Sequence, residues 1–599
     1  MMKMSDENLD LKIARILQDT NVIAMVGASA NWKRPSFFVL KYLLEQGYDV
    51  IPVNPKEAGN KILGAKVVAS LKDINRPVDM VDVFRRPEDC PDIARDAVAI
   101  GAKFLWLQQK IVSEEARLIA EEGGLEVVMD LCPKIEHSRL NGLLGVHGFD
   151  SRVLTSRRRK VMPPKPAPRD AGLTHSKHIE TLSIHAGAAP DPVSGARVTP
   201  IYQNTAFVFD DAEHASGLFN LQTPGNIYGR LSNPTTAALE QRIAALEGGI
   251  GSTCCSSGHA AQMIALLPLM EPGRKIVAST RLYGGTITQF SKTFERFGWS
   301  AIFVDTDDKS AVEKAVSDPD VRLVFAESLA NPGGVVSDIT MLADIAHQAG
   351  IPLVIDSTMA TPALCRPMDH GADIVVHSTT KFLSGHGNAM GGAVVDSGRF
   401  DWSQGRGYPA LAEPEPAYHG ITFYETFGPL AYTNYNHAVG LRDLGPTMAP
   451  MNAFLTLTGM ETLALRMRAH VAHARQVAEF LNQHGKVLEV SYAGLPGSPW
   501  KDMADKYMPL GPGSVFTFKI DGGFEDGCKL VAHCNLFSHL ANIGDTRSLI
   551  LHPASTTHRQ LSDEQRAKAG IADNMLRVSI GLEHPEDLMN DLQAALAVV

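Results

Sequence analysis

The sequence has little cysteine and no long hydrophobic run. Its 599 residues include seven cysteines, an odd number, and Cys254 and Cys255 are adjacent. The spacing forms neither a disulfide framework nor a CxxC metal pattern, so we expect free thiols and no metal site. No apolar run approaches the ~20 residues that span a bilayer, and the first residues, MMKMSDENLDLK, lack the apolar core of a secretory signal. The sequence therefore predicts a cytoplasmic protein without a membrane partner.

The chain also lacks the positive charge of a nucleic-acid binder. Its formal net charge is −10 and its pI is near 6.1, which argues against nucleic acid as a partner. With 44% hydrophobic and 20% charged residues, the composition is that of an ordinary globular protein. The length exceeds that of one domain, so we expect several.

Residues 1–140 show short apolar runs that alternate with helical stretches. Such runs are typical of buried parallel strands, and here they occur at Asn21–Val26, Tyr48–Pro55, Val78–Phe84, Lys103–Leu107 and Leu125–Asp130. The alternation predicts a Rossmann-like, doubly wound parallel α/β domain.

The first strand of this domain is followed by Gly27 alone rather than by GxGxxG, so a dinucleotide is weakly supported. The motifs VGAS, RPS, IPVNP and DLCPKIEH together resemble the small bacterial CoA-binding domain family. That resemblance implies CoA or an acyl-CoA as a ligand of a binding or regulatory domain. The alternative is a tight turn in a domain that has lost its ligand. The residues implied near the pyrophosphate are Gly27, Ala28, Ser29 and Lys33, and those near the adenosine part are Val53, Asn54 and Pro55.

Residues 141–174 differ in composition from both neighbours. Arg157 to Lys160 are four consecutive basic residues, and four prolines follow by Pro168. Proline removes backbone donors and stiffens the chain, so this segment is predicted to be an extended linker between two separately folded modules.

The most informative stretch runs from Ile351 to Gly392. Two short apolar runs end in polar residues, the first at Asp356 and the second at His377-Ser378-Thr379-Thr380-Lys381. Ligands bind at the carboxyl ends of parallel strands. A lysine that can condense with an aldehyde, beside a carboxylate that can pair with a pyridinium nitrogen, suits pyridoxal 5'-phosphate (PLP). Taken singly, Lys381 could be a solvated loop lysine and Asp356 a helix cap.

The linked motif Asp356 and Ser378-Thr379-Thr380-Lys381 resembles the lysine segment of the Cys/Met-metabolism family of PLP-dependent enzymes. The resemblance extends from about His175 to the C-terminus. It implies a fold-type I PLP-dependent transferase with an N-terminal arm at 175–230, a large α/β domain at 231–435 and a smaller C-terminal α/β domain at 436–599.

The same resemblance assigns roles around the cofactor. Lys381 and Tyr283 are implied to be catalytic, with Tyr283 stacked on the pyridine ring, and Asn331 is implied to lie near the phenolic oxygen. Glu327 is expected to be a scaffold residue. The phosphate is implied to be held by Ser257, Gly258, the amide of His259, Ser378 and Thr380, and by Tyr228 and Arg230 of a neighbouring subunit. A complete site then needs a dimer or tetramer.

The C-terminal part carries the signs of substrate choice. By the resemblance, Arg577 takes the substrate carboxylate and Ser548 supports it. LHPASTTH with LSDEQRAKAGI is similar to the O-acetylhomoserine sulfhydrylase branch, which implies γ-replacement on O-acetylhomoserine by sulfide or methanethiol in methionine biosynthesis and trans-sulfuration. The alternatives are a cystathionine γ-synthase or methionine γ-lyase activity, the latter disfavoured because those lyases carry cysteine where Gly285 stands, and a CoA-sensing regulator with an inactive PLP module.

Overall fold

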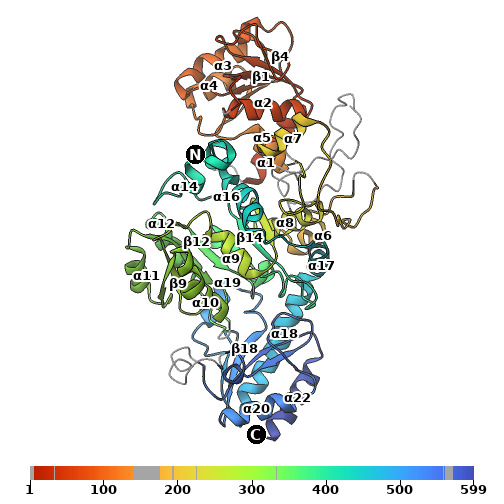
Figure 1. Cartoon of the computed structure of the whole chain (residues 1–599), viewed down its shortest axis with the longest axis vertical. Helices are drawn as coiled ribbons and strands as arrows, with labels where there is room; N and C mark the ends of the chain where they lie inside the picture. The colour runs from red at the N-terminus through yellow and green to blue at the C-terminus, as the bar shows by residue number, and fades with distance from the viewer. Residues whose placement is uncertain are drawn as a thin grey trace.

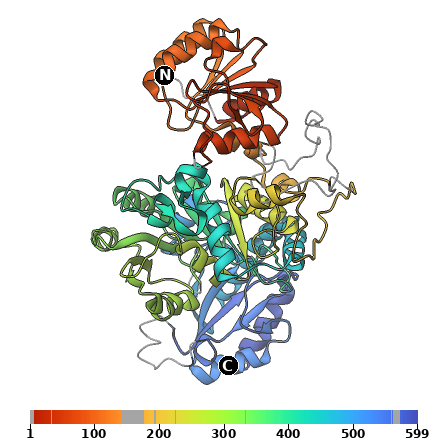
Figure 2. The same cartoon turned by 45° about the horizontal axis from the view of Figure 1, so that its top comes forward.

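The computed structural model describes residues 6–32, 34–140, 176–191, 194–223, 225–331, 334–557, 559 and 571–599. Three α/β bodies follow one another along the long axis of the molecule (Figure 1). The N-terminal body occupies one end, the C-terminal body the other, and the largest body lies between them, an order that is also plain in the turned view of Figure 2. Lys33 and the predicted linker lie outside the described residues.

The N-terminal body is a five-stranded parallel sheet in the order β2-β1-β5-β6-β7. The strand order reverses between β1 and β5, which is the switch point where doubly wound sheets bind ligands. The Rossmann-like fold predicted for this region is confirmed. Its strands are β1 (Val22–Val26), β2 (Asp49–Val53), β5 (Met80–Val83), β6 (Phe104–Leu107) and β7 (Glu126–Val128), with a small hairpin β3 (Lys61–Ile62) and β4 (Ala65–Lys66). Its helices are α1 (Asp6–Asp19), α2 (Pro35–Glu45), α3 (Cys90–Ala99), α4 (Glu114–Glu122) and α5 (Pro133–Leu140).

The central body has a seven-stranded sheet in the order β10-β9-β11-β12-β13-β14-β8, in which β14 runs antiparallel to both of its neighbours. Its strands read as continuous apolar runs because helices cover both faces. The strands are β8 (Gly251–Cys255), β9 (Lys275–Ser279), β10 (Ser300–Val304), β11 (Val321–Glu327), β12 (Leu353–Asp356), β13 (Ile374–His377) and β14 (Gly392–Asp396). The helices are α6 (Ile179–His185), α7 (Ala212–Phe219), α8 (Pro234–Glu247), α9 (Gly258–Leu266), α10 (Gly284–Thr288), α11 (Lys309–Val316), α12 (Ile339–Gln348), α13 (Thr361–Leu364), α14 (Pro409–Ala412), α15 (Phe423–Phe427) and α16 (Ala431–Tyr435).

The C-terminal body is a five-stranded sheet in the order β17-β18-β21-β20-β19, with β19 and β20 parallel and the other pairs antiparallel. Together with the central body it confirms the predicted pair of α/β domains. The strands are β17 (Val487–Ser491), β18 (Val515–Ile520), β19 (Ser538–His539), β20 (Leu549–Leu551) and β21 (Met575–Ser579). The helices are α17 (Pro450–Met460), α18 (Leu463–Gln483), α19 (Lys501–Tyr507), α20 (Phe524–His533) and α22 (Pro585–Ala597).

The stretch 451–483 has an amphipathic pattern along its whole length but forms two helices, α17 and α18. The break has a local cause at Gly459, whose carbonyl accepts hydrogen bonds from the Thr462 hydroxyl at 3.3 Å and from Arg466 at 2.9 Å. These side chains satisfy a carbonyl that the next helical turn would otherwise take. The expected boundary at residue 436 also falls inside a helix, because α16 runs on as a π-helix, η9 (Asn436–Leu444).

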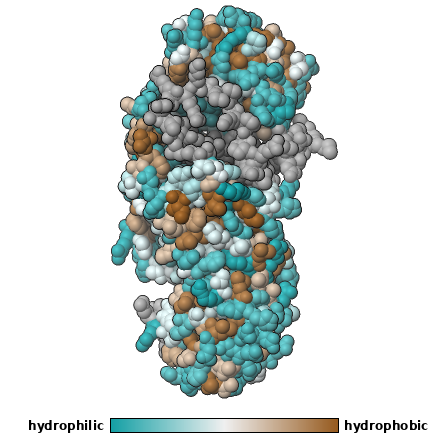
Figure 3. Space-filling model, turned by 90° about the vertical axis from the view of Figure 1, so that its right-hand side faces the viewer, coloured by the Kyte–Doolittle hydropathy of each residue, from teal (hydrophilic) through white to brown (hydrophobic). Residues whose placement is uncertain are grey.

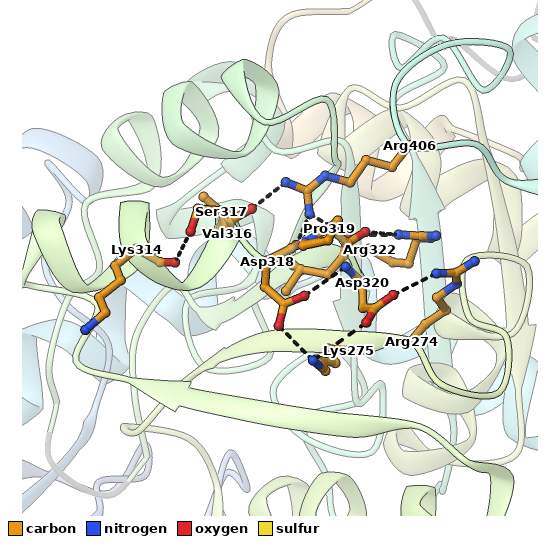
Figure 4. A network of polar contacts seen from close by, with 11 residues as sticks. Arg274, Lys275, Lys314, Val316, Ser317, Asp318, Pro319, Asp320, Arg322 and Arg406 are labelled. Atoms are coloured by element: carbon orange, nitrogen blue, oxygen red, sulfur yellow. Dashed lines mark hydrogen bonds and ion pairs between the residues drawn. The ribbon is translucent and has the colours of Figure 1, made fainter.

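Buried and surface arginines hold the loops of the central body by their backbone carbonyls. In Figure 4, Arg406 reaches the carbonyls of Val316, Asp318 and Val321, the last at 2.9 Å. The same network includes an ion pair of 2.7 Å between Lys275 and Asp318. One guanidinium thus fixes the turn that joins α11 to β11.

No helix within the described ranges is long and apolar enough to cross a membrane. In the same ranges no group of three or more His, Cys, Asp or Glu side chains could hold a metal ion.

Replacing Arg242 with Met should destabilise the central body. Arg242 is 1% exposed and donates to the carbonyls of Ile184, Ala186 and Leu457 at 3.0–3.1 Å. Three orphaned carbonyls at about 1 kcal/mol or more each predict a loss of about 3 kcal/mol or more, measurable as a lower denaturant midpoint. R468M removes an exposed pair with Glu180 and should lose less than about 1 kcal/mol; equal losses in the two variants would contradict this account.

Candidate active site

A cavity of about 230 Å³ lies between the central and C-terminal bodies, where β11, β12 and β13 end. The sequence-predicted residues that line it are Ser257, Gly258, His259, Tyr283, Glu327, Asn331, Asp356, Ser378, Thr380, Lys381 and Arg577. They come from seven segments spread over more than half of the chain. The strands of the central sheet bring all of them but Arg577 together because the carboxyl ends of these strands share one edge; Arg577 comes from β21 of the C-terminal body.

Lys381 is the half-buried amine of this cavity. It follows β13 after a short turn, and its Nζ donates to Asn542 Oδ1 at 2.5 Å. Burial, and then the nearby Arg577 guanidinium, lower the pKa of Lys381 to about 8. Both causes disfavour the ammonium form, so the free-amine fraction of Lys381 near neutral pH exceeds that of an exposed lysine, and free amine is the form that attacks an aldehyde.

Asp356 ends β12 and is held from two sides. Its Oδ1 accepts from the Thr358 backbone N–H at 2.9 Å, and its Oδ2 lies 3.4 Å from Gln262 Nε2. Gln262 is itself fixed by a 2.9 Å bond to Thr286 Oγ1. The carboxylate therefore lines the cavity in a fixed position and does not cap a helix.

The start of α9 forms an anion cup. Ser257 Oγ accepts from the Ala260 N–H at 3.2 Å and so caps the helix. A Cβ on Gly258 would lie 2.7 Å from Ser378 Cβ, so this close approach of two loops requires glycine. Thr380 Oγ1 bonds to both backbone groups of Gly391 at 3.0 and 3.1 Å. Free N–H groups at a helix start and two nearby hydroxyls suit a phosphate.

Glu327 acts as the scaffold that the sequence predicted. Its two carboxyl oxygens accept from the backbone N–H groups of Tyr283 and Asn331, at 2.6 and 3.1 Å. Burial, and then the neighbouring Asp356, raise the pKa of Glu327 to about 8. In the folded chain this carboxyl thus keeps its proton at pH values where an exposed glutamate is ionised.

The imidazole of His259 occupies the space above Gly285. A Cβ on Gly285 would lie 2.5 Å from Tyr283 Cε1 and 2.8 Å from His259 Cε1. The His259 and Tyr283 rings meet edge to face with centroids 6.0 Å apart. A side chain at position 285 is therefore excluded unless both rings move. The Tyr283 ring is 46% exposed, on the open side of the cavity.

Arg577 and Ser548 have different surroundings. Arg577 is 9% exposed, lines the cavity, and donates to Asn331 Oδ1 at 3.4 Å and to the Asn542 carbonyl at 3.1 Å. Ser548 is fully buried and does not line the cavity. Its hydroxyl donates to Glu583 Oε2 and accepts from the Gly581 N–H, each at 2.8 Å. Ser548 therefore lies outside the cavity with its hydroxyl bonded to Glu583 and Gly581, and the support that it is expected to give to carboxylate binding by Arg577 stays a prediction.

Tyr228 and Arg230 do not line the cavity of their own chain. Both are exposed, and the Arg230 guanidinium lies 5.5 Å from the Tyr228 ring centroid. The role expected of them, as ligands of the cofactor phosphate in a neighbouring subunit, stays a prediction.

The residues expected to bind CoA surround the β1–α2 turn. Gly27 has φ 87°, and a Cβ there would lie 2.4 Å from the Phe84 carbonyl oxygen. Asn54 Nδ2 donates to the Ala28 carbonyl at 2.7 Å, which ties the two halves of the predicted set together. Lys33 is outside the described residues. CoA binding by the described members (Gly27, Ala28, Ser29, Val53, Asn54 and Pro55) stays a prediction.

Sequence reasoning missed several residues of the cavity. Asn542 bridges Lys381 and Arg577, and Gln262 orients Asp356. Asn542 stands six residues before Ser548, and Gln262 stands three residues after His259, so each is close in sequence to a residue that the resemblance named. Neither carries a charge, and only the tertiary fold shows their partners.

Comparisons with known proteins agree with this geometry. Residues 180–597 match the family described as Cys/Met metabolism PLP-dependent enzyme. The chain belongs to this family. Residues 21–138 match the family described as CoA binding domain.

Two curated members of the Cys/Met family are similar over nearly their whole length. The O-acetyl-L-homoserine sulfhydrylase of Leptospira meyeri is 46% identical, covering 70% of this chain and 96% of the relative. O-acetyl-L-homoserine sulfhydrylase 1 of Thermus thermophilus is 45% identical, covering 70% and 100%.

Two solved structures of relatives also match. An O-acetylhomoserine (thiol)-lyase from Campylobacter jejuni, solved with a pyridoxyl-lysine monophosphate, is 39% identical with a TM-score of 0.68, covering 70% of this chain and all of that one. A cystathionine gamma synthase from Xanthomonas oryzae is 32% identical with a TM-score of 0.60, covering 70% of this chain and 98% of that one. These matches confirm the family and its PLP-dependent chemistry.

The cavity fits the PLP of this Cys/Met family. It offers an amine of lowered pKa at Lys381 and a fixed carboxylate at Asp356. It also offers an anion cup in which position 258 has no room for a Cβ. When bound, PLP supplies an electron sink for charge that develops on the substrate.

Replacing Arg577 with Gln should raise the pKa of Lys381. The change removes one of the two causes that disfavour the ammonium form, while burial remains, so we expect a rise of about one unit or less. The pH midpoint for the rate at which PLP reacts with the apoenzyme should shift upward by the same amount. R547Q, which alters an exposed arginine of the same body, is the control. A midpoint unchanged in R577Q would contradict the assignment.

Proposed function

We propose that the chain catalyses γ-replacement on O-acetyl-L-homoserine by sulfide or methanethiol, giving homocysteine or methionine and acetate. The bond from Cγ to the acetate oxygen breaks, a carbon–sulfur bond forms at Cγ, and the thiol proton leaves with the acetate.

The observation that carries the proposal is the cavity itself, in which a half-buried amine, Lys381, and a buried guanidinium, Arg577, share Asn542 as a hydrogen-bond partner. The sulfhydrylases of Leptospira meyeri and Thermus thermophilus, each about as long as the matching part of this chain, support the choice of reaction.

The residues of the cavity divide the work of this reaction. Arg577, whose planar fork can hold two oxygens, binds the substrate carboxylate. Lys381, as a free amine of lowered pKa, takes the proton from the substrate Cα and returns it later. Tyr283, held by its backbone to Glu327 on the open side of the cavity, assists departure of the acetate.

A complete site in this proposal includes a second copy of the chain. Tyr228 and Arg230 point away from their own cavity, and the arm around them exposes large apolar side chains. Val208 is 92% exposed and Val198 63%. Figure 3 shows hydrophobic residues gathered across the middle of one face of the molecule. A partner subunit that covers the arm would bury such residues and receive Arg230 at its phosphate cup. The assembly of the chain as a dimer or tetramer and its cytoplasmic location stay predictions.

Product release measured with three substrates tests the reaction: acetate from O-acetylhomoserine, succinate from O-succinylhomoserine and ammonia from methionine. O-acetylhomoserine with sulfide should release acetate in a thiol-dependent manner, while O-succinylhomoserine and methionine should turn over more slowly. Equal or faster turnover of O-succinylhomoserine with cysteine would favour the cystathionine γ-synthase activity instead, and ammonia release from methionine would favour the lyase.

Mixing two inactive variants tests the shared site. K381A lacks the catalytic amine and R230A lacks the partner's phosphate ligand, so each alone should be nearly inactive. In a mixed dimer one site regains both groups, and random exchange should restore about a quarter of wild-type activity. Mixing K381A with K381A-R230A, in which no site can be complete, is the control. No recovery from the first mixture, once subunit exchange is shown, would contradict a shared site.

A further inference from the structure

A cavity of about 960 Å³ lies between the N-terminal body and the central body. One wall consists of residues at the carboxyl ends of β5 and β6 and at the start of α2, which is the ligand-binding edge of a doubly wound sheet. The opposite wall belongs to the PLP module, from α15, α16 and the segment after α7. In Figures 1 and 2 the N-terminal body rests above these elements. The residues contributed by the PLP module are Leu221, Gln222, Tyr424, Glu425, Thr426, Phe427, Leu430 and Asn434.

The lining of this cavity combines positive charge with apolar surface. Its cationic residues are Arg34, Lys56, Arg85, Arg86, Lys110 and Lys134, and its acidic residues are Glu88, Asp89 and Glu425. Six cations against three acids leave an excess of positive charge in a chain whose formal net charge is −10. Such a wall favours a ligand that carries several phosphates and an apolar portion.

Two lysines of the N-terminal body reach aromatic rings of the PLP module. Lys110 Nζ lies 4.8 Å from the ring centroid of Tyr424, and Lys134 Nζ lies 5.7 Å from that of Phe427. Both lysines line the cavity, so an anion that binds them acts on contacts that join the two modules. Burial lowers the pKa of Lys134, and an anionic ligand would relieve that unfavourable burial.

The wall on the PLP module is continuous with the phosphate cup. α16, which carries Asn434, continues into η9, which ends at Leu444. Two residues further along the chain, the Pro446 carbonyl accepts from the Ser256 N–H at 2.8 Å. Thr447 pairs with Cys255 and donates to the Arg230 carbonyl at 2.9 Å. Movement of α16 would therefore reach the residue before Ser257 and also the arm.

A second contact joins the same helix to the cup. His437, on η9, lies 3.5 Å from Glu240, and Glu240 accepts from the Cys254 N–H at 2.8 Å. Cys254 is in β8, the strand that leads into the cup. Through the contacts of His437 and Pro446, the helix formed by α16 and η9 is thus linked both to β8 and to the turn that precedes Ser257.

We propose that this cavity is a regulatory site built jointly by the two modules, and that a polyphosphate ligand with an apolar portion, of the nucleotide class that includes CoA, changes the phosphate cup through α16. The match to the CoA binding domain family ends at residue 138 and does not include the wall of the PLP module. The wall of the PLP module and its coupling to the cup thus extend the site beyond that domain. The measurements of CoA binding and of cofactor absorbance do not depend on which thiol or acyl group the enzyme uses.

Calorimetric titration of the full-length holoenzyme with CoA, and with ATP for comparison, tests the shared wall. K56E on the N-terminal body and Y424A on the PLP module should each weaken binding by at least about tenfold. Two variants of exposed residues outside the cavity, K61E on the N-terminal body and F297A on the central body, should stay within about twofold of the wild type. The shared site would be overturned if the wild type bound neither nucleotide. It would also be overturned if Y424A bound CoA as tightly as the wild type does.

The visible absorbance of the bound cofactor tests the coupling. CoA should change this band in the wild type and in K61E, and the change should be lost in Y424A at the same CoA concentration. Binding that leaves the band unchanged in the wild type would overturn the regulatory role, because the cup would then not sense the cavity.

Discussion

The active site depends on keeping two cationic side chains, the half-buried Lys381 and the buried Arg577, together in one cavity. Burial lowers the pKa of both groups, to about 8 for Lys381, where the Arg577 guanidinium adds to the effect, and to about 10 for Arg577. The surrounding structure compensates with neutral acceptors, the side chain and the carbonyl of Asn542. A cavity of this kind favours anionic cofactors and substrates and leaves its amine reactive.

The rest of the central body supports this arrangement. Parallel strands end at one edge and deliver Glu327, Asp356 and the segment before Lys381 to the same place. Glu327 then fixes Tyr283 and Asn331 by their backbone N–H groups. The C-terminal body adds Arg577 and Asn542, so the cavity forms only when the two bodies are docked.

Much of this could be predicted from the sequence, because strong local patterns carried it. The apolar runs predicted the parallel strands, and the Ser378 to Lys381 motif predicted the lysine and its family. The split between α17 and α18 could not be predicted, since it depends on Arg466 reaching the Gly459 carbonyl. The surroundings of Ser548 were also hidden, because its partners Glu583 and Gly581 lie more than 30 residues away. Uncharged residues such as Asn542 show their importance only through tertiary contacts.

The shared wall between the modules has a consequence for the integrity of the chain. Leu221, Phe427 and Leu430 are 5%, 8% and 2% exposed in the full chain, and all three line the cavity that the N-terminal body closes. A PLP module separated from its N-terminal neighbour would present these apolar side chains to water, and such patches promote aggregation. Once the two modules had adapted to each other in this way, losing the N-terminal one would reduce solubility as well as any regulation.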